Sequence, residues 1–213
     1  MVKPKIKFYF LWLSLICIAM FILQNLPGIP GFTETFVLNS KAGDDFQIWR
    51  SVSAIFLHGS LVHLIYNLFA LLLFGFILEK LIGSRRFLIL FFVSGVVANI
   101  IGVNFYSSSL GASGAIYGIL GAIVVLRPMM MVWAFGLMMP MFVAGILWVV
   151  GDIMGVFGFG DSGVGNIAHL GGIFVGLLYG FWWRFVLKRK VVKMEGVEVP
   201  DEVVNSWERD WME

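Results

Sequence analysis

Long runs of Leu, Ile, Val, Phe, Met and Gly alternate with short polar breaks along this 213-residue chain. A helix needs about 20 apolar residues to cross a bilayer, so the pattern predicts six membrane-spanning helices. We expect them at residues 8–24, 61–78, 87–105, 113–126, 130–150 and 166–187. Pro128 follows the fourth run and is expected to separate the fourth helix from the fifth. The predicted fold class is all-α, a polytopic bundle of six helices.

Composition identifies the solvent of these helices. Hydrophobic residues make up 60% of the chain and charged residues 13%, and the mean hydropathy is +0.93. A soluble domain of this size could not bury so much apolar surface, so lipid must cover part of it. The first run follows three lysines but precedes no small-x-small cleavage site. We therefore expect a retained helix and not a signal peptide.

The basic residues predict the orientation. With six spans both termini lie on one side, and that side receives thirteen of the fifteen Lys and Arg residues. These are Lys3, Lys5, Lys7, Lys80, Arg85, Arg86, Arg127, Arg184, Lys188, Arg189, Lys190, Lys193 and Arg209. Only Lys41 and Arg50 fall on the other side. The positive-inside rule then places both termini in the cytosol, in an integral protein of the cell membrane.

The chain divides into a membrane domain, residues 1–190, and a short cytosolic tail, residues 191–213. In the tail, Val204, Trp207 and Trp211 have helical spacing. Two interpretations remain open, an amphipathic helix on the membrane surface and a disordered tail.

The fourth predicted helix is unusually short. Residues 113–126 would rise only about 21 Å, against a hydrocarbon core of about 30 Å. Backbone at membrane depth must not face lipid unsatisfied, so the preceding "YSSSLGA" must be buried in protein or line a wet cavity. We expect Ser113 to begin this helix at the bottom of a water-accessible depression.

Four polar side chains lie at membrane depth, all in the predicted outer half: His63, Asn67, Ser113 and His169. Each is a functional hypothesis because polar groups are costly there. His63 and Asn67 are four residues apart and share a helix face, where their N–H groups suit a developing oxyanion. A helix N-terminus at Ser113 favours the same anion. A serine, a histidine and such donors are the components of acyl transfer.

Glycine spacing indicates which helices meet. Small residues repeat in the sixth helix and in the fourth, at Gly172, Gly176 and Gly180 and at Gly114, Gly118 and Gly121. Such stripes allow close backbone approach, so we expect these two helices to pack together. His169 precedes Gly172 by one helical turn and therefore points at the partner helix.

Each of these features also has an interpretation without catalysis. A GxSG in a membrane helix often serves packing, and a histidine at a helix end is often structural. His58 and His63 are five apart and lack an acidic companion, so a zinc site is not expected, nor is any other metal or cofactor. The Met-rich "RPMMMVWAFGLMMP" fits lipid-facing or core packing. No feature indicates nucleic-acid binding.

Taken together, the motifs from about Trp49 to Tyr179 resemble the rhomboid family of intramembrane serine proteases. "WRSVSAIFLHGSLVHLIYNL" resembles the family's Trp-Arg loop followed by His-x-x-x-Asn, and "ILEKLIGSRR" resembles its Glu-x-x-x-Gly-Ser. "GASGAIYG" is similar to the nucleophile motif with its following Tyr, and "AHLGG" to the Ala-His-x-x-Gly of the sixth helix.

The resemblance implies a role for each matching residue. Ser113 would be the nucleophile and His169 its general base, with His63, Asn67 and the Ser113 backbone N–H as the oxyanion hole. The supporting residues would be Tyr117, Gly111, Gly114 and Gly172, with Tyr117 packed on the His169 ring. Arg50, Glu79 and Ser84 would be structural. No Asp or Glu lies within plausible reach of His169 in the sequence, so we expect a dyad oriented by packing, with modest turnover.

The implied reaction is hydrolysis of peptide bonds in or near a transmembrane helix of another membrane protein, with the bilayer as the other partner. A catalytically silent rhomboid-like protein that binds membrane helices is the alternative, and intact Ser113 and His169 argue against it. A channel or transporter is a third hypothesis, which the lack of mid-span charges disfavours. The fifth helix and the Gly-rich loop at residues 151–165 are candidate gates, and an ordinary connection remains equally open.

Overall fold

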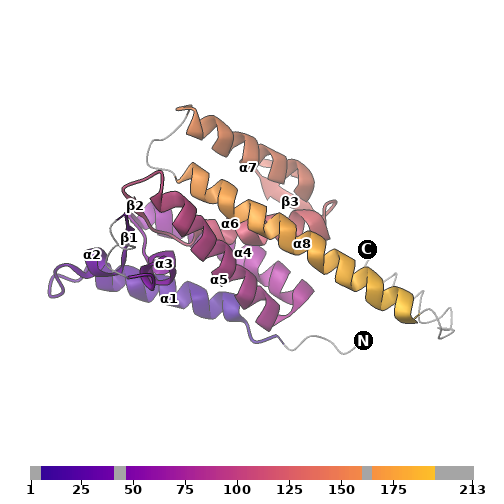
Figure 1. Cartoon of the computed structure of the whole chain (residues 1–213), viewed down its shortest axis with the longest axis horizontal. Helices are drawn as coiled ribbons and strands as arrows, with labels where there is room; N and C mark the ends of the chain where they lie inside the picture. The colour runs from indigo at the N-terminus through magenta and orange to yellow at the C-terminus, as the bar shows by residue number, and fades with distance from the viewer. Residues whose placement is uncertain (1–5, 41–46, 160–164, 195–213) are drawn as a thin grey trace.

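The computed structural model describes residues 6–40, 47–159 and 165–194, with side chains to residue 185. The helices and strands run along the chain as shown in Figure 1. In order they are α1 (Tyr9–Gln24), α2 (Phe32–Phe36), β1 (Leu38–Asn39), α3 (Arg50–Ser53), η1 (Ala54–Phe56), α4 (Leu61–Ile82), α5 (Ser84–Val103), β2 (Ser108–Ser109), α6 (Ser113–Leu126), β3 (Met131–Ala134), β4 (Leu137–Pro140), α7 (Met141–Val156) and α8 (Asn166–Met194).

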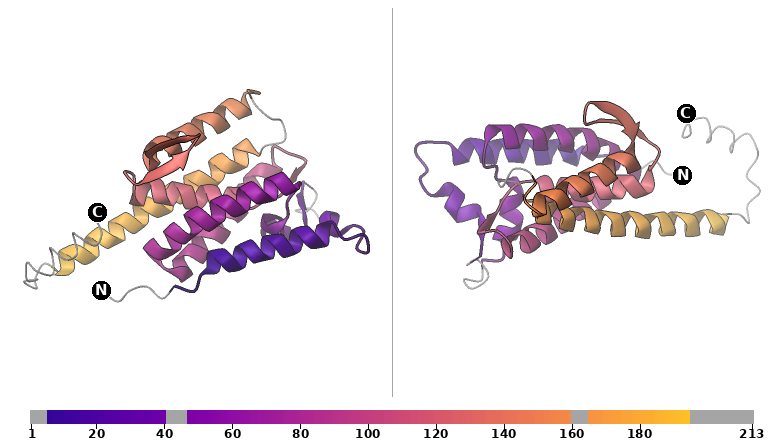
Figure 2. Two further views of the ribbon diagram at one scale, coloured as in Figure 1. Left: turned by 180° about the vertical axis from the view of Figure 1, so that it is seen from behind. Right: turned by 90° about the horizontal axis from the view of Figure 1, so that it is seen from above.

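The short helix α6 lies at the centre of the bundle. It contacts α4, α5, α7 and α8, and ten of its fourteen residues are buried. Its bounds, Ser113 and Leu126, are those the hydrophobic pattern predicts. Figure 2 shows α8, the longest helix, passing α6 and continuing well beyond it. A helix surrounded in this way can be short because protein and not lipid meets its ends.

Helices α6 and α8 touch along their glycines, as the spacing predicts. A Cβ atom added at Gly172 would overlap the carbonyl oxygen of Gly114, and one added at Gly176 would overlap that of Gly118. The same approach repeats one turn later, where a Cβ at Gly180 would lie 3.1 Å from the Ala122 carbonyl oxygen. The two backbones are therefore in direct contact, a separation that only glycine permits.

Each of the six predicted segments overlaps a helix, namely α1, α4, α5, α6, α7 and α8. Among the described residues, α4 and α5 are long and apolar enough to cross a membrane by length and composition, and α1, α6 and α7 are apolar but shorter. Helix α8 has 29 residues. The architecture is an all-α helical bundle with two small two-stranded sheets. The number of crossings and the side of each terminus stay predictions.

The prediction for the fifth helix is wrong at its start. Residues 131–140 form an antiparallel hairpin of β3 and β4, and α7 begins only at Met141. Phe135 and Gly136 both have positive φ, +53° and +77°, as the two central residues of a tight type I′ turn require. The backbone N–H and C=O groups of the apolar stretch after Pro128 are therefore paired across a hairpin. Helix α7 also extends past residue 150, to Val156.

Arg50, the first residue of α3, is bonded to α2 and to the residue that follows α2. Its guanidinium donates to the backbone carbonyls of Glu34 at 2.7 Å and Val37 at 3.1 Å. Ser53 Oγ donates to the Phe36 carbonyl at 2.8 Å, and β1 pairs with β2 ahead of α6. The pairing of β1 with β2 links this region to the chain just before α6.

Glu79 joins α1 to the α4–α5 turn at the opposite end of the bundle. Its fully buried carboxylate accepts bonds from the backbone N–H groups of Tyr9 and Phe10, each at 3.1 Å, and from Ser84 Oγ at 2.6 Å. Two backbone N–H groups at the start of a helix are otherwise unsatisfied, so this carboxylate acts as an N-terminal cap supplied from another helix.

Some expectations fall outside the described residues. The tail with Val204, Trp207 and Trp211, and the loop glycines Gly160 and Gly163, are among them.

We expect Gly176→Ala to lower the free energy of unfolding by about 3 kcal/mol, because the new methyl group overlaps backbone that cannot move aside. Gly151→Ala is the control, since a Cβ at Gly151 meets no atom within 4 Å, and it should leave stability unchanged or slightly higher. Unfolding in mixed micelles measures both. Equal effects of the two substitutions would contradict the close α6–α8 contact.

Candidate active site

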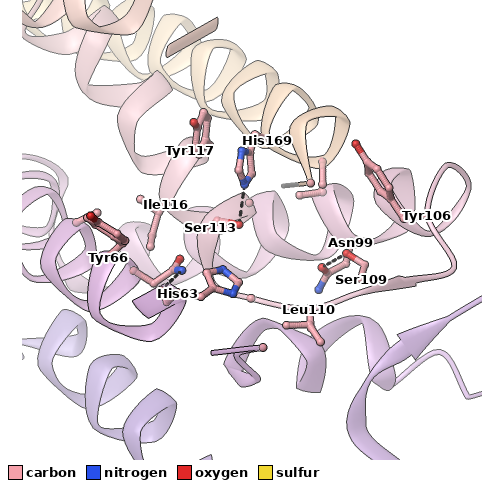
Figure 3. A pocket seen from close by; sticks show the side chains of 18 of the residues that line it. His63, Tyr66, Asn99, Tyr106, Ser109, Leu110, Ser113, Ile116, Tyr117 and His169 are labelled. Carbon is pink, nitrogen blue, oxygen red and sulfur yellow. Dashed lines mark hydrogen bonds between the residues drawn. The ribbon is translucent and has the colours of Figure 1, made fainter. Parts of the chain in front are cut away.

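Ser113 and His169 lie within hydrogen-bonding distance although 56 residues separate them. Ser113 Oγ on α6 is 2.9 Å from His169 Nε2 on α8, and Figure 3 shows the imidazole pointing at the hydroxyl. The histidine is 9% exposed. An imidazole nitrogen without its proton accepts from a hydroxyl at this distance, which is the geometry of a base and its nucleophile.

The local backbone presents Ser113 at the start of its helix. Gly111 has φ +117°, a value that L residues avoid, and its N–H donates to the Ala54 carbonyl at 2.9 Å. A Cβ added there would lie 2.8 Å from His63 Cε1. Glycine is therefore required at this turn for both conformation and space. Gly114, next to Ser113, lies against Gly172 of α8.

Tyr117 stacks on His169. Their ring centroids are 4.2 Å apart and the planes differ by 13°. Tyr117 is one turn beyond Ser113 on α6, so the same helix carries the hydroxyl and the ring that flanks the imidazole. The stack restricts the tilt of the imidazole plane.

Asp152 overturns the expectation that no carboxylate reaches His169. Its Oδ1 lies 3.0 Å from His169 Nδ1, and the two side chains are 5% and 11% exposed. The hydrophobic pattern predicts a loop at this residue, because it places the fifth helix at residues 130–150. In the structure it is the twelfth residue of α7, one turn before the helix ends. An acidic residue inside an apolar helix is the signal that would have identified it.

His63 and Asn67 both line the cavity and also contact each other and neighbouring residues. The Asn67 amide donates to the His63 carbonyl at 2.8 Å. The His63 ring lies against Gly111 and packs edge-on to His58, with centroids 5.1 Å apart. The structure thus places both residues on the wall of the cavity that Ser113 also lines. Figure 3 shows His63 on the side of Ser113 opposite His169.

A cavity of about 940 Å³ opens at these groups. Its lining includes Ser113, His169, His63 and Asn67, and it also includes Tyr66 and Tyr106, which the sequence reasoning did not select. The strand residue Ser109 at its edge donates to Asn99 at 2.8 Å. A space of this size holds several residues of an extended peptide, and its polar groups gather around Ser113.

The three residues to which the family resemblance gives structural roles lie away from the cavity. Arg50, Glu79 and Ser84 make the backbone and cap bonds described above and do not line this cavity. Among residues 6–40, 47–159 and 165–185, no group of three or more His, Cys, Asp or Glu could hold a metal ion.

His58 precedes α4 and packs beneath His63. It is 2% exposed, its Nδ1 lies 3.3 Å from the Phe56 carbonyl, and its Nε2 has no hydrogen-bond partner in the described part of the chain. Burial, with a smaller contribution from the neighbouring His63, lowers the pKa of His58 to about 4. His58 is therefore neutral at physiological pH, which adds no charge beside His63.

Comparison with known proteins gives a consistent family. Residues 45–184 match the family described as Rhomboid domain. The chain is 29% identical over 169 residues to the proteins named "Rhomboid protease GlpG" of Yersinia pseudotuberculosis (strain IP32953) and Yersinia pestis (strain Pestoides F). It is 29% identical over 172 residues to that of Yersinia enterocolitica (strain NCTC 13174 / 8081). Each match covers 78% of this chain and 59% of the relative.

We expect stability to fall as the pH drops from about 6.5 towards 4. In that window the unfolded chain binds a proton at His58 and the folded chain does not, and the loss reaches about 3 kcal/mol when complete. Above pH 6.5 His58 contributes no pH dependence. Unfolding free energies at pH 7 and 5 measure the effect, with non-titrating His58→Gln as control. The same pH dependence in both proteins would contradict the assignment.

Proposed function

This chain belongs to the rhomboid family, and we propose that it is an intramembrane serine endopeptidase. Its substrates are transmembrane segments of other membrane proteins, cut in or near the bilayer. The observation that carries the proposal is the 2.9 Å contact between Ser113 Oγ and His169 Nε2 at the wall of a cavity inside a helical bundle. The relatives named as rhomboid proteases support it, although the chain spans 59% of their length.

The proposed reaction begins at the serine. His169 Nε2 takes the hydroxyl proton of Ser113 as Oγ attacks the scissile carbonyl carbon. The carbonyl oxygen becomes an oxyanion, and the Ser113 backbone N–H and the side chains of His63 and Asn67 are its proposed donors. Collapse breaks the C–N bond, and His169 returns its proton to the leaving amine. A water molecule then attacks the acyl-enzyme while His169 takes its proton. When the ester bond breaks, His169 returns that proton to Ser113 Oγ and the acid product leaves.

Neighbouring residues prepare these groups. Gly111 turns the chain so that Ser113 starts α6, and Gly114 and Gly172 let α6 and α8 approach until the serine and histidine meet. Tyr117 holds the plane of the imidazole. The N-terminus of α6 adds unsatisfied N–H groups and a favourable dipole where negative charge develops.

Substrate chemistry follows from the need to expose a carbonyl. A peptide bond inside a regular helix has its oxygen occupied, so the substrate helix must unwind locally before Ser113 can attack. Segments with glycine or proline near the cleavage site therefore make better substrates. The cavity opens to the outer face, with both termini in the cytosol, in the orientation that the basic residues favour.

We expect a fluorophosphonate to label the wild type in proteoliposomes and to leave Ser113→Ala unlabelled. His169→Ala should be labelled at least about 100-fold more slowly, because the serine loses its base. Ser108→Ala is the matched control, since Ser108 is an exposed serine of the same cavity and should be labelled like the wild type.

Cleavage of a single-span substrate reconstituted with each variant should follow the labelling. A folded wild type that neither labels nor cleaves would favour a silent helix-binding protein instead.

A further inference from the structure

Asp152 is a buried acidic residue that the reaction proposed above does not use. It is the only ionisable residue of α7, a helix of sixteen residues of which four are buried. Its neighbours Ile153 and Met154 are 43% and 48% exposed, on faces suited to lipid. A carboxylate inside such a helix is costly unless it has a specific partner, so its presence calls for a function.

Asp152 is hydrogen-bonded to His169, the proposed general base. Oδ1 lies 3.0 Å from His169 Nδ1, whereas Oδ2 makes no hydrogen bond in the described part of the chain. The phenol of Tyr117 also interacts electrostatically with this carboxylate. Three side chains from two helices thus surround the imidazole: Ser113 on α6 at Nε2, Tyr117 of the same helix on its face, and Asp152 on α7 at Nδ1.

The two contacts at the imidazole edge require one tautomer. An ionised carboxylate can only accept, so a hydrogen bond with Asp152 puts the proton on Nδ1. Nε2 is then left with its lone pair facing Ser113 Oγ, which is the form that can remove a proton. Stacking cannot make this choice, because the face of Tyr117 offers no acceptor in the plane of the imidazole nitrogens. Tyr117 fixes the ring plane, and Asp152 fixes the proton and the rotation within that plane.

We propose that Asp152 is a positioning residue that completes a Ser113–His169–Asp152 triad by holding the Nδ1–H tautomer of His169. The inference rests on the proposed function and deepens it. During acylation His169 gains the proton of Ser113, and the adjacent carboxylate stabilises the imidazolium without itself taking a proton. The base is oriented by a carboxylate as well as by packing.

The relative loss of activity in two variants, Asp152→Asn and Asp152→Ala, distinguishes a positioning role from a packing role. Asp152→Asn keeps the size of the side chain, but its amide NH₂ can donate to Nδ1 and thereby favour the Nε2–H tautomer, which cannot act as a base. Asp152→Ala removes the side chain and imposes no tautomer. If Asp152 only fills space, Asn should be the milder change. If it holds the tautomer, Asn should be as damaging as Ala or worse.

We expect Asp152→Asn to lower kcat for a reconstituted single-span substrate about 100-fold, with KM changed less than about threefold. Asp152→Ala should lower kcat by about 10- to 100-fold, and the control Ile153→Ala, on the exposed face of α7, by less than about twofold. A wild-type kcat in Asp152→Asn, or an Asn variant clearly more active than the Ala variant, would overturn the proposal.

A spectroscopic measurement reports the tautomer directly, even in a variant of low stability. The chain has three histidines, so ¹⁵N-histidine spectra are simple, and His169→Gln assigns the signal. We expect Nδ1–H in the wild type and a shift towards Nε2–H in Asp152→Asn. An Nε2–H tautomer in the wild type would refute the inference by itself. An inactive wild type with the Nδ1–H tautomer would refute the proposed protease and leave the contact of Asp152 with His169 intact.

Discussion

The direct backbone contact between α6 and α8 is the constraint on which the candidate site depends. Ser113 and His169 lie on these two helices, and their 2.9 Å contact is accompanied by the close approach of Gly172 and Gly176 to the backbone of Gly114 and Gly118. A side chain at Gly172 or Gly176 would overlap that backbone and push the two helices apart. Packing in lipid lacks a hydrophobic driving force between helices, so such close van der Waals contact is also a main source of their association.

The remaining elements are joined by bonds to backbone groups. Arg50 donates to the backbone of Glu34 and Val37, and Glu79 caps α1 from the α4–α5 turn. Both act through backbone groups, which cannot be left unpaired in a dry environment. Ser113 then begins α6 beside a cavity inside the bundle and not against lipid.

Asp152 differs from the other site residues in where it comes from. Tyr117, Ser113 and His169 are carried by the two locked helices, whereas Asp152 is carried by α7, which lies at the edge of the bundle in Figure 1 and buries few side chains. The hairpin of β3 and β4 takes residues 131–140, and α7 runs from Met141 to Val156 with Asp152 as its twelfth residue. A helix other than α6 and α8 thereby contributes to the surroundings of the imidazole.

By itself the sequence determined the helical class, the bounds of α6 and the pairing of α6 with α8, and it selected Ser113, His169, His63 and Asn67, which line one cavity in the structure. These follow from local properties: length of apolar runs, glycine spacing and the rarity of polar groups in lipid. Only the tertiary structure decided that residues 131–140 form a hairpin and that Asp152 meets His169. An apolar run of that length suits a strand pair and a helix equally, and the choice depends on backbone pairing across a turn. The contact of Asp152 then depends on the register of α7 against α8, which no local pattern encodes.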